Sequence, residues 1–121
     1  IRNPAVHRLE FRPPDGTCNL YLAYAAMLMA GLDGIKNKID PGEPVNKNLE
    51  HLTEKEREKI PLLPTSLTKA LNALEEDYEF LLKGGVFTED LIKLWVKMKR
   101  RDVEELRFRP HPWEYRLYYD K

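Results

Sequence analysis

The chain has 121 residues, the size of one domain, and carries 20 basic and 20 acidic side chains. Because its formal net charge is zero, no long-range field would draw it to nucleic acid or to an anionic membrane surface. The one cysteine, Cys18, excludes an intrachain disulfide and fits a reducing compartment, so we expect a cytoplasmic location. A start at Ile1 instead of Met suggests a fragment or a processed chain.

The opening residues predict a strand over about 7–12, because Arg8-Leu9-Glu10-Phe11-Arg12 alternates charged and apolar side chains. In an extended strand, Arg8, Glu10 and Arg12 would share one face. A carboxylate between two guanidiniums suits a site that holds a divalent metal on Glu10 and anionic oxygens on the arginines. A surface strand whose charges pair with neighbouring residues stays open as the alternative, since exposed ion pairs are common.

The apolar run from Leu20 to Leu32 predicts a helix over about 19–36, with Asn19 as its N-cap. Its thirteen residues are fewer than the ~20 that a membrane-spanning helix needs, so we expect no membrane segment. The run is apolar on every side, which is typical of a helix enclosed by protein. The charged and proline-rich remainder is too short to enclose it, so we expect this helix to lie inside something larger.

Residues 37–64 form a long connection with four prolines, and connections of this length are usually functional or mobile. Inside it, Thr53-Glu54-Lys55-Glu56 matches the capping box and predicts one or two helical turns.

Two further helices are predicted, and together with the first helix and the strand they indicate a mainly α-helical α+β fold. Ser66 caps a helix over about 66–83 that ends at Gly84-Gly85, and Thr88 caps a helix over about 88–106. Helical spacing gives the first an apolar stripe of Leu67, Ala70, Leu71, Leu74 and Tyr78, and the second one of Leu91, Leu94, Trp95, Met98 and Leu106.

The C-terminus is a short aromatic tail, with four aromatic side chains within residues 113–119. So many aromatic side chains predict a tail that is docked on its own core or inserted into a partner.

His7, His51 and His111 show no metal-ligand spacing. The basic run 97–101 is followed by acidic residues, which favours a solvated helix face.

Five stretches of sequence occur in order along nearly the whole chain and carry a family resemblance. They are Arg8 to Arg12 followed by Pro14-Asp15, the run MAGLDGIKNKI at 29–39, Pro41-Gly42-Glu43-Pro44, LLKGGVF at 81–87, and RPHPWEY at 109–115. Together they resemble the C-terminal part of the catalytic domain of type I glutamine synthetase. The resemblance implies that residues 1–121 are this portion, without the N-terminal β-grasp-like domain and the first part of the catalytic domain.

The family makes glutamine from glutamate and ammonia with ATP, through phosphorylation of the glutamate side-chain carboxylate. The resemblance implies that Glu10 binds Mg²⁺ or Mn²⁺ and that Arg12 contacts the substrate glutamate and the transferred phosphoryl group. It also implies that Arg8 and Arg2 lie near the nucleotide. The other metal ligands of the family are absent from these residues, so we expect residues 1–121 alone to be inactive. A non-catalytic helical binding or regulatory module derived from the family is the alternative.

Two further expectations follow from the resemblance. Some family members carry a tyrosine in an Asn-Leu-Tyr pattern that is adenylylated, whereas this chain has Glu50 after Asn48-Leu49, so we expect no adenylylation there. The family assembles as a dodecamer of two facing rings, and the resemblance implies that the tail ties the rings together through Trp113, Tyr115, Leu117 and Tyr119.

Overall fold

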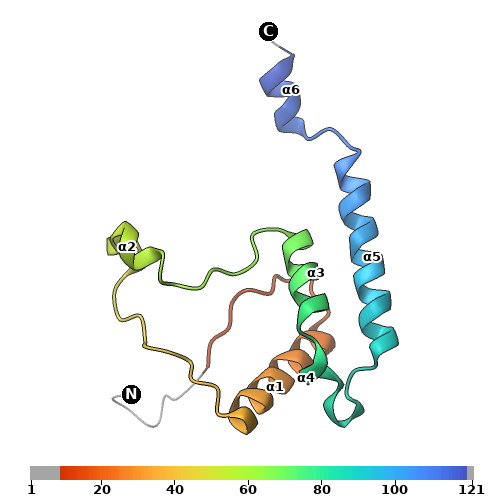
Figure 1. Ribbon diagram of the computed structural model, residues 1–121. Coiled ribbons are helices and arrows are strands. Elements are labelled where there is room, and N and C mark those ends of the chain that lie inside the picture. Colours follow the sequence, from red (N-terminus) through yellow and green to blue (C-terminus); the bar gives the residue numbers. More distant parts are fainter. Residues whose placement is uncertain (1–8, 120–121) are drawn as a thin grey trace. The chain divides into compact units, whose positions relative to one another are not determined.

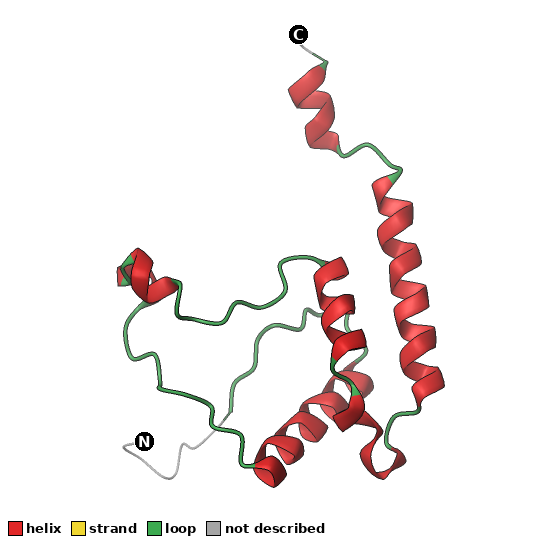
Figure 2. Ribbon diagram, viewed as in Figure 1, coloured by secondary structure: helices red, strands yellow, loops and turns green. Residues whose placement is uncertain are grey.

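The computed structural model describes residues 9–119, and every regular element within that range is a helix (Figure 1, Figure 2). In chain order the elements are α1 (Leu20–Asn37), η2 (Leu49–His51), α2 (Glu54–Arg57), α3 (Leu67–Glu76), α4 (Glu79–Leu82), η3 (Lys83–Gly85), α5 (Glu89–Arg107) and α6 (Pro112–Tyr118), of which η2 and η3 are 3₁₀ helices. The chain divides into two compact units, Ile1–Ile39 and Asp40–Lys121.

The predicted strand over about 7–12 is wrong for its described residues, because 9–12 are irregular and no strand occurs anywhere in 9–119. Residues 7 and 8 lie outside the described part of the chain. Alternation of charged and apolar side chains specifies a face, but a strand also needs a neighbouring strand to satisfy its backbone N–H and C=O groups. The described residues offer no such neighbour, so the architecture is mainly α-helical without the β component.

Helix α1 confirms the helix predicted over about 19–36. The Asn19 side chain accepts hydrogen bonds from the backbone N–H of Tyr21 at 3.1 Å and of Leu22 at 3.2 Å. The helix ends at Lys38, which adopts the left-handed conformation with φ of 51°. Most of its apolar side chains are exposed, and Met29 is the one buried residue. The described residues of the first unit therefore do not enclose this helix. No helix within residues 9–119 is long and apolar enough to cross a membrane.

The second unit is held together by the packing of α3 against α5. Leu71 on α3 is buried, as are Ile92 and Val96 on α5. Leu81 and Phe87, from the connection between the two helices, are buried as well. At the rim, two groups of α3 hold the Arg100 guanidinium: Asn72 Oδ1 accepts a hydrogen bond of 2.9 Å from Nη2, and the Glu75 carboxylate forms an ion pair with it.

The predicted helix over about 66–83 is two helices instead of one. Ser66 caps α3 as predicted, with its hydroxyl accepting from Lys69 N–H at 3.2 Å. The helix then ends at Glu76, because Asp77 and Tyr78 leave helical geometry with ψ of 84° and −2°. Asp is a poor interior helix residue since its side chain competes for backbone groups. The chain turns again at Gly84, whose φ of 69° favours glycine.

Helix α5 begins and ends close to the predicted 88–106, but the predicted apolar face is not the buried one. Thr88 Oγ1 accepts from the backbone N–H of Leu91 at 3.3 Å, which confirms the predicted cap. The buried residues are Ile92 and Val96, whereas Leu94, Met98 and Leu106 of the predicted stripe are exposed. The helix has apolar side chains on two sides, and α3 covers only one of them.

The aromatic tail forms a short helix, α6, that the sequence pattern did not predict. His111 caps it, since its Nδ1 accepts a hydrogen bond from the Trp113 N–H at 3.1 Å, and Pro112 occupies its first turn. The Arg116 guanidinium lies 4.9 Å from the centre of the Trp113 ring. Trp113, Tyr115, Leu117 and Tyr119 are all exposed, so the tail is not buried against the described residues.

We call the contact of α3 with α5, in which Leu71, Ile92 and Val96 are buried, the α3–α5 seam. It predicts the effect of shortening Leu71, which is only 3% exposed. Leu71→Ala should lower the free energy of unfolding of the second unit by about 2 kcal/mol or more, because it leaves a cavity between the helices. Urea denaturation followed by circular dichroism measures this loss. Leu67→Ala on the same helix, where the side chain is exposed, should cost about 0.5 kcal/mol or less. Equal losses for the two variants would contradict the assignment of the seam.

Candidate functional site

The charged residues that open the described chain, Glu10 and Arg12, form a direct ion pair. Arg12 Nε donates a hydrogen bond of 2.6 Å to Glu10 Oε1, and Arg12 Nη2 pairs with the same oxygen. The side chains are 82% exposed for Arg12 and 49% exposed for Glu10. Arg2 and Arg8 lie outside the described residues. The structure therefore brings together two of the four predicted site residues, within the irregular segment 9–12.

The donor chemistry of this pair suits one ligand of a divalent metal, but not a whole coordination shell. Mg²⁺ prefers oxygen ligands and commonly takes one or two carboxylates together with substrate phosphates and water. Glu10 supplies one carboxylate. Within residues 9–119, no three His, Cys, Asp or Glu side chains lie close enough together to hold a metal ion. A complete site thus requires donors beyond the described residues.

Glu50 lies on an ordered turn inside the long connection. Asn48 caps this turn, with its side-chain oxygen accepting from Glu50 N–H at 3.1 Å. Behind it, Arg57 Nη2 donates to the backbone oxygens of Leu49 at 3.2 Å and Glu50 at 3.5 Å. These contacts use the backbone of Glu50, and the residue as a whole is exposed.

The capping box predicted at Thr53 is confirmed, and its acidic residue, Glu56, also forms an ion pair. The Thr53 N–H and hydroxyl donate to Glu56 Oε2 at 2.9 Å and 2.8 Å, while Lys47 Nζ pairs with Glu56 Oε1. The hydrogen bond from Lys47, followed by those from Thr53, lowers the pKa of Glu56 from 4.5 to about 2. Glu56 therefore stays ionised at neutral pH and connects the two ends of segment 47–56.

The lowered pKa of Glu56 predicts that α2 is sensitive to acid. A carboxyl group whose pKa falls on folding contributes its stabilisation fully above pH 4.5 and loses it as the pH falls toward about 2. Over this range we expect the amide protons of α2 to lose protection from exchange, as measured by NMR.

The variant Glu56→Gln should show the same loss already at pH 7, because the amide cannot reproduce the charged bonds to Lys47 and Thr53. Glu54→Gln, in the same helical turn, is the matched control and should leave α2 protected. Protection in Glu56→Gln equal to that of the unchanged chain would show that Glu56 does not hold this segment together.

A groove beside the α3–α5 seam gathers residues that the sequence pattern did not single out as a site. Lys93, Lys97 and Arg100 line it from α5, and Tyr78 lines it from the connection before α4. The basic run 97–101 was predicted to be a solvated helix face, and Lys93 lies outside that run. The spacing of 93, 97 and 100, which places three cations on one helix face, is the signal that could have indicated the groove.

Comparison with known proteins places this geometry in context. The family model described as "Glutamine synthetase, catalytic domain" matches residues 1–118. The chain is 60% identical over 119 residues to a glutamine synthetase from Aquifex aeolicus, an alignment that covers 98% of this chain and 25% of that protein. With the same coverage, it is 56% identical to glutamine synthetases from Microchaete diplosiphon and Mycolicibacterium smegmatis. The chain spans about a quarter of the length of these curated relatives.

Proposed function

This chain belongs to the glutamine synthetase family, within its catalytic domain, and we propose that it is the C-terminal portion of that domain in an ATP-dependent glutamate–ammonia ligase. The observation that carries this proposal is the match of residues 1–118 to the catalytic-domain family model. Since 60% identity extends over 119 residues to a glutamine synthetase, the ligase is favoured over a non-catalytic binding or regulatory module.

In the proposed reaction, the side-chain carboxylate of glutamate attacks the terminal phosphoryl group of ATP and forms γ-glutamyl phosphate. Ammonia then displaces phosphate at the activated carbonyl carbon and gives glutamine. Both steps concentrate negative charge on oxygens, so the site needs fixed cations where that charge develops. A guanidinium suits this task because it stays protonated and presents a planar fork to carboxylate or phosphate oxygens.

We assign Arg12 to the substrate glutamate and the transferred phosphoryl group, and Arg8 and Arg2 to the nucleotide. The Glu10–Arg12 pair supports the role of Arg12, because the ion pair holds the Arg12 guanidinium close to the carboxylate that would bind metal. Bound Mg²⁺ or Mn²⁺ would supply neutralisation of phosphate charge, with Glu10 as one of its ligands. Glu50 lacks the phenol oxygen that an adenylyl group would need, so we expect no adenylylation at this position.

A graft tests the proposed function. Residues 1–119 would replace the aligned quarter of the Aquifex aeolicus relative, and ATP-dependent glutamine formation would be measured. We expect the graft to be active and Glu10→Gln within it to lower kcat about 100-fold, because one charged metal ligand is lost. The loss of kcat in Glu10→Gln should become smaller as the concentration of Mg²⁺ or Mn²⁺ is raised. Residues 1–121 alone should make no glutamine.

Glu43→Gln is the matched control for this graft, since Glu43 is an exposed carboxylate outside the opening segment. It should leave kcat and the metal requirement unchanged. An active graft in which Glu10→Gln behaves like Glu43→Gln would refute the assigned role of Glu10. An inactive graft that assembles normally would count against the ligase assignment itself.

We also propose that α6 is the contact through which two rings of subunits hold together in a dodecamer. Trp113 and Leu117 are four residues apart and so lie on one side of the helix, while Tyr115 and Tyr119 lie on another, with ring centres 5.1 Å apart. All four side chains are exposed in the described chain. Aromatic side chains of this kind dominate the energetics of buried protein interfaces.

Removing the Trp113–Leu117 side of α6 should therefore separate the rings. In the grafted protein, the double variant Trp113→Ala and Leu117→Ala should shift the native mass from dodecamer toward hexamer, since both anchors lose their apolar contact area. Native mass spectrometry or analytical ultracentrifugation measures the shift. Glu114→Gln, in the same helix, should leave the mass unchanged. A stable dodecamer in the double variant would remove α6 as the inter-ring contact.

A further inference from the structure

We propose that the groove beside the α3–α5 seam binds a small organic monoanion. The apolar body of this ligand lies on Ile92 and Val96, and its carboxylate or phosphate group pairs with Lys97. This site lies within the second unit, and it is independent of Glu10, Arg12 and the proposed ligase chemistry. Its residues come from α5, from Glu75 near the end of α3, and from Tyr78 in the connection before α4.

The shape of the groove supports a small ligand. Its volume is about 470 Å³, which is within the range of small-molecule pockets. Ile92 and Val96 line it but are only 6% and 5% exposed, so its apolar floor is the part of each side chain that the packing against α3 leaves open. A floor that rests on a packed seam keeps its shape when a ligand arrives, which lowers the cost of binding.

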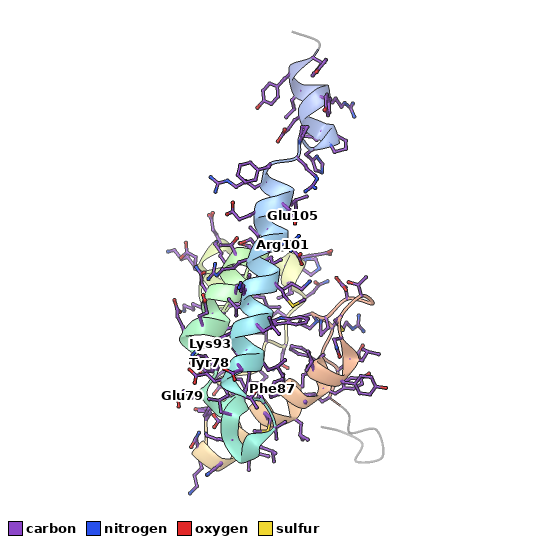
Figure 3. All side chains as sticks on the ribbon, turned by 90° about the vertical axis from the view of Figure 1, so that its right-hand side faces the viewer. Tyr78, Glu79, Phe87, Lys93, Arg101 and Glu105 are labelled. Atoms are coloured by element: carbon purple, nitrogen blue, oxygen red, sulfur yellow. The ribbon has the colours of Figure 1, made fainter. Side chains whose placement is uncertain are left out.

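Two of the three cations along the groove are already neutralised by acidic neighbours. At one end, Lys93 Nζ pairs with Glu89 Oε1 at 2.8 Å, and the Tyr78 hydroxyl donates to the same oxygen at 3.4 Å. Tyr78 and Lys93 lie side by side next to the first turns of α5 (Figure 3). At the other end, Arg100 is held by Glu75 and Asn72.

Lys97 lies between these two pairs and supplies the unneutralised charge. It is four residues after Lys93 and three before Arg100, so all three side chains project from one face of α5. Within residues 9–119 no acidic side chain lies within ion-pair distance of Lys97. The groove therefore has one excess positive charge at its middle and a carboxylate near each end.

This charge pattern selects the class of ligand. A single exposed ammonium group binds an inorganic ion weakly, because both are well hydrated, so affinity requires apolar contact with the floor as well. A polyanion such as a nucleic acid would meet Glu75 and Glu89 at the ends and be repelled. A monoanion with a flat apolar body satisfies both conditions.

The test uses the graft of residues 1–119 into the Aquifex aeolicus relative, with ¹³C-labelled Ile and Val methyl groups. Benzoate and methyl phenyl phosphate, which are both monoanions at neutral pH, are the probes, and their comparison distinguishes a carboxylate from a phosphate ligand. We expect saturable shifts of the Ile92 and Val96 methyl signals with at least one probe. Lys97→Gln should weaken that binding about fivefold to tenfold, since a charge-assisted bond is lost. Lys55→Gln, which removes an exposed lysine of α2, should leave it unchanged.

Three outcomes would overturn the proposal. Methyl signals of Ile92 and Val96 at unfolded-chain positions would mean that the chain has no such groove. Shifts that do not saturate, or that are equal in Lys97→Gln and Lys55→Gln, would mean that Lys97 holds no anion. Equal binding of inorganic phosphate would mean that the apolar floor plays no part. Failure here with an active ligase graft would leave the proposed function untouched, because the two tests use different residues.

Discussion

The packing of α3 against α5 is the contact on which the arrangement of residues 67–107 depends. The two amphipathic helices bury Leu71, Ile92 and Val96 against each other, and the turn at Gly84 lies in the connection between them. Elsewhere in the described chain, large apolar side chains are mostly exposed, including those of α1 and α6. A small chain has much surface for its volume and can bury few side chains. The α3–α5 seam is therefore the principal apolar core that residues 40–119 provide.

The starts of the helices could be predicted from the sequence because they depend on neighbours in the chain. Asn19, Ser66 and Thr88 each accept the backbone hydrogen bonds expected of an N-cap, and Thr53 forms the expected capping box with Glu56. Features that depend on distant partners were predicted wrongly. The strand at 7–12 needed a neighbouring strand, and the buried face of α5 was decided by where α3 lies.

At the candidate site, too, features set by neighbours in the chain could be predicted, and features set by distant groups could not. Residues two apart in the chain are near enough for long side chains to meet, so the contact between Glu10 and Arg12 follows from local spacing without a sheet. Whether this pair binds metal or substrate is decided by groups that local spacing does not specify. The groove on α5 was missed because its signal, three cations at helical spacing, was interrupted by apolar residues and read as surface charge.

Exposure determines what the charged pair at Glu10 and Arg12 can do. In the described chain both side chains are in contact with water, where an ion pair contributes little to stability and exerts little force on a substrate. The same two groups would act strongly if other protein covered them, since electrostatic interactions grow as water is excluded. The proposed ligase chemistry therefore depends less on the pair itself than on the protein that surrounds it. This is also why an intact sequence pattern at 8–12 is compatible with an inactive isolated chain.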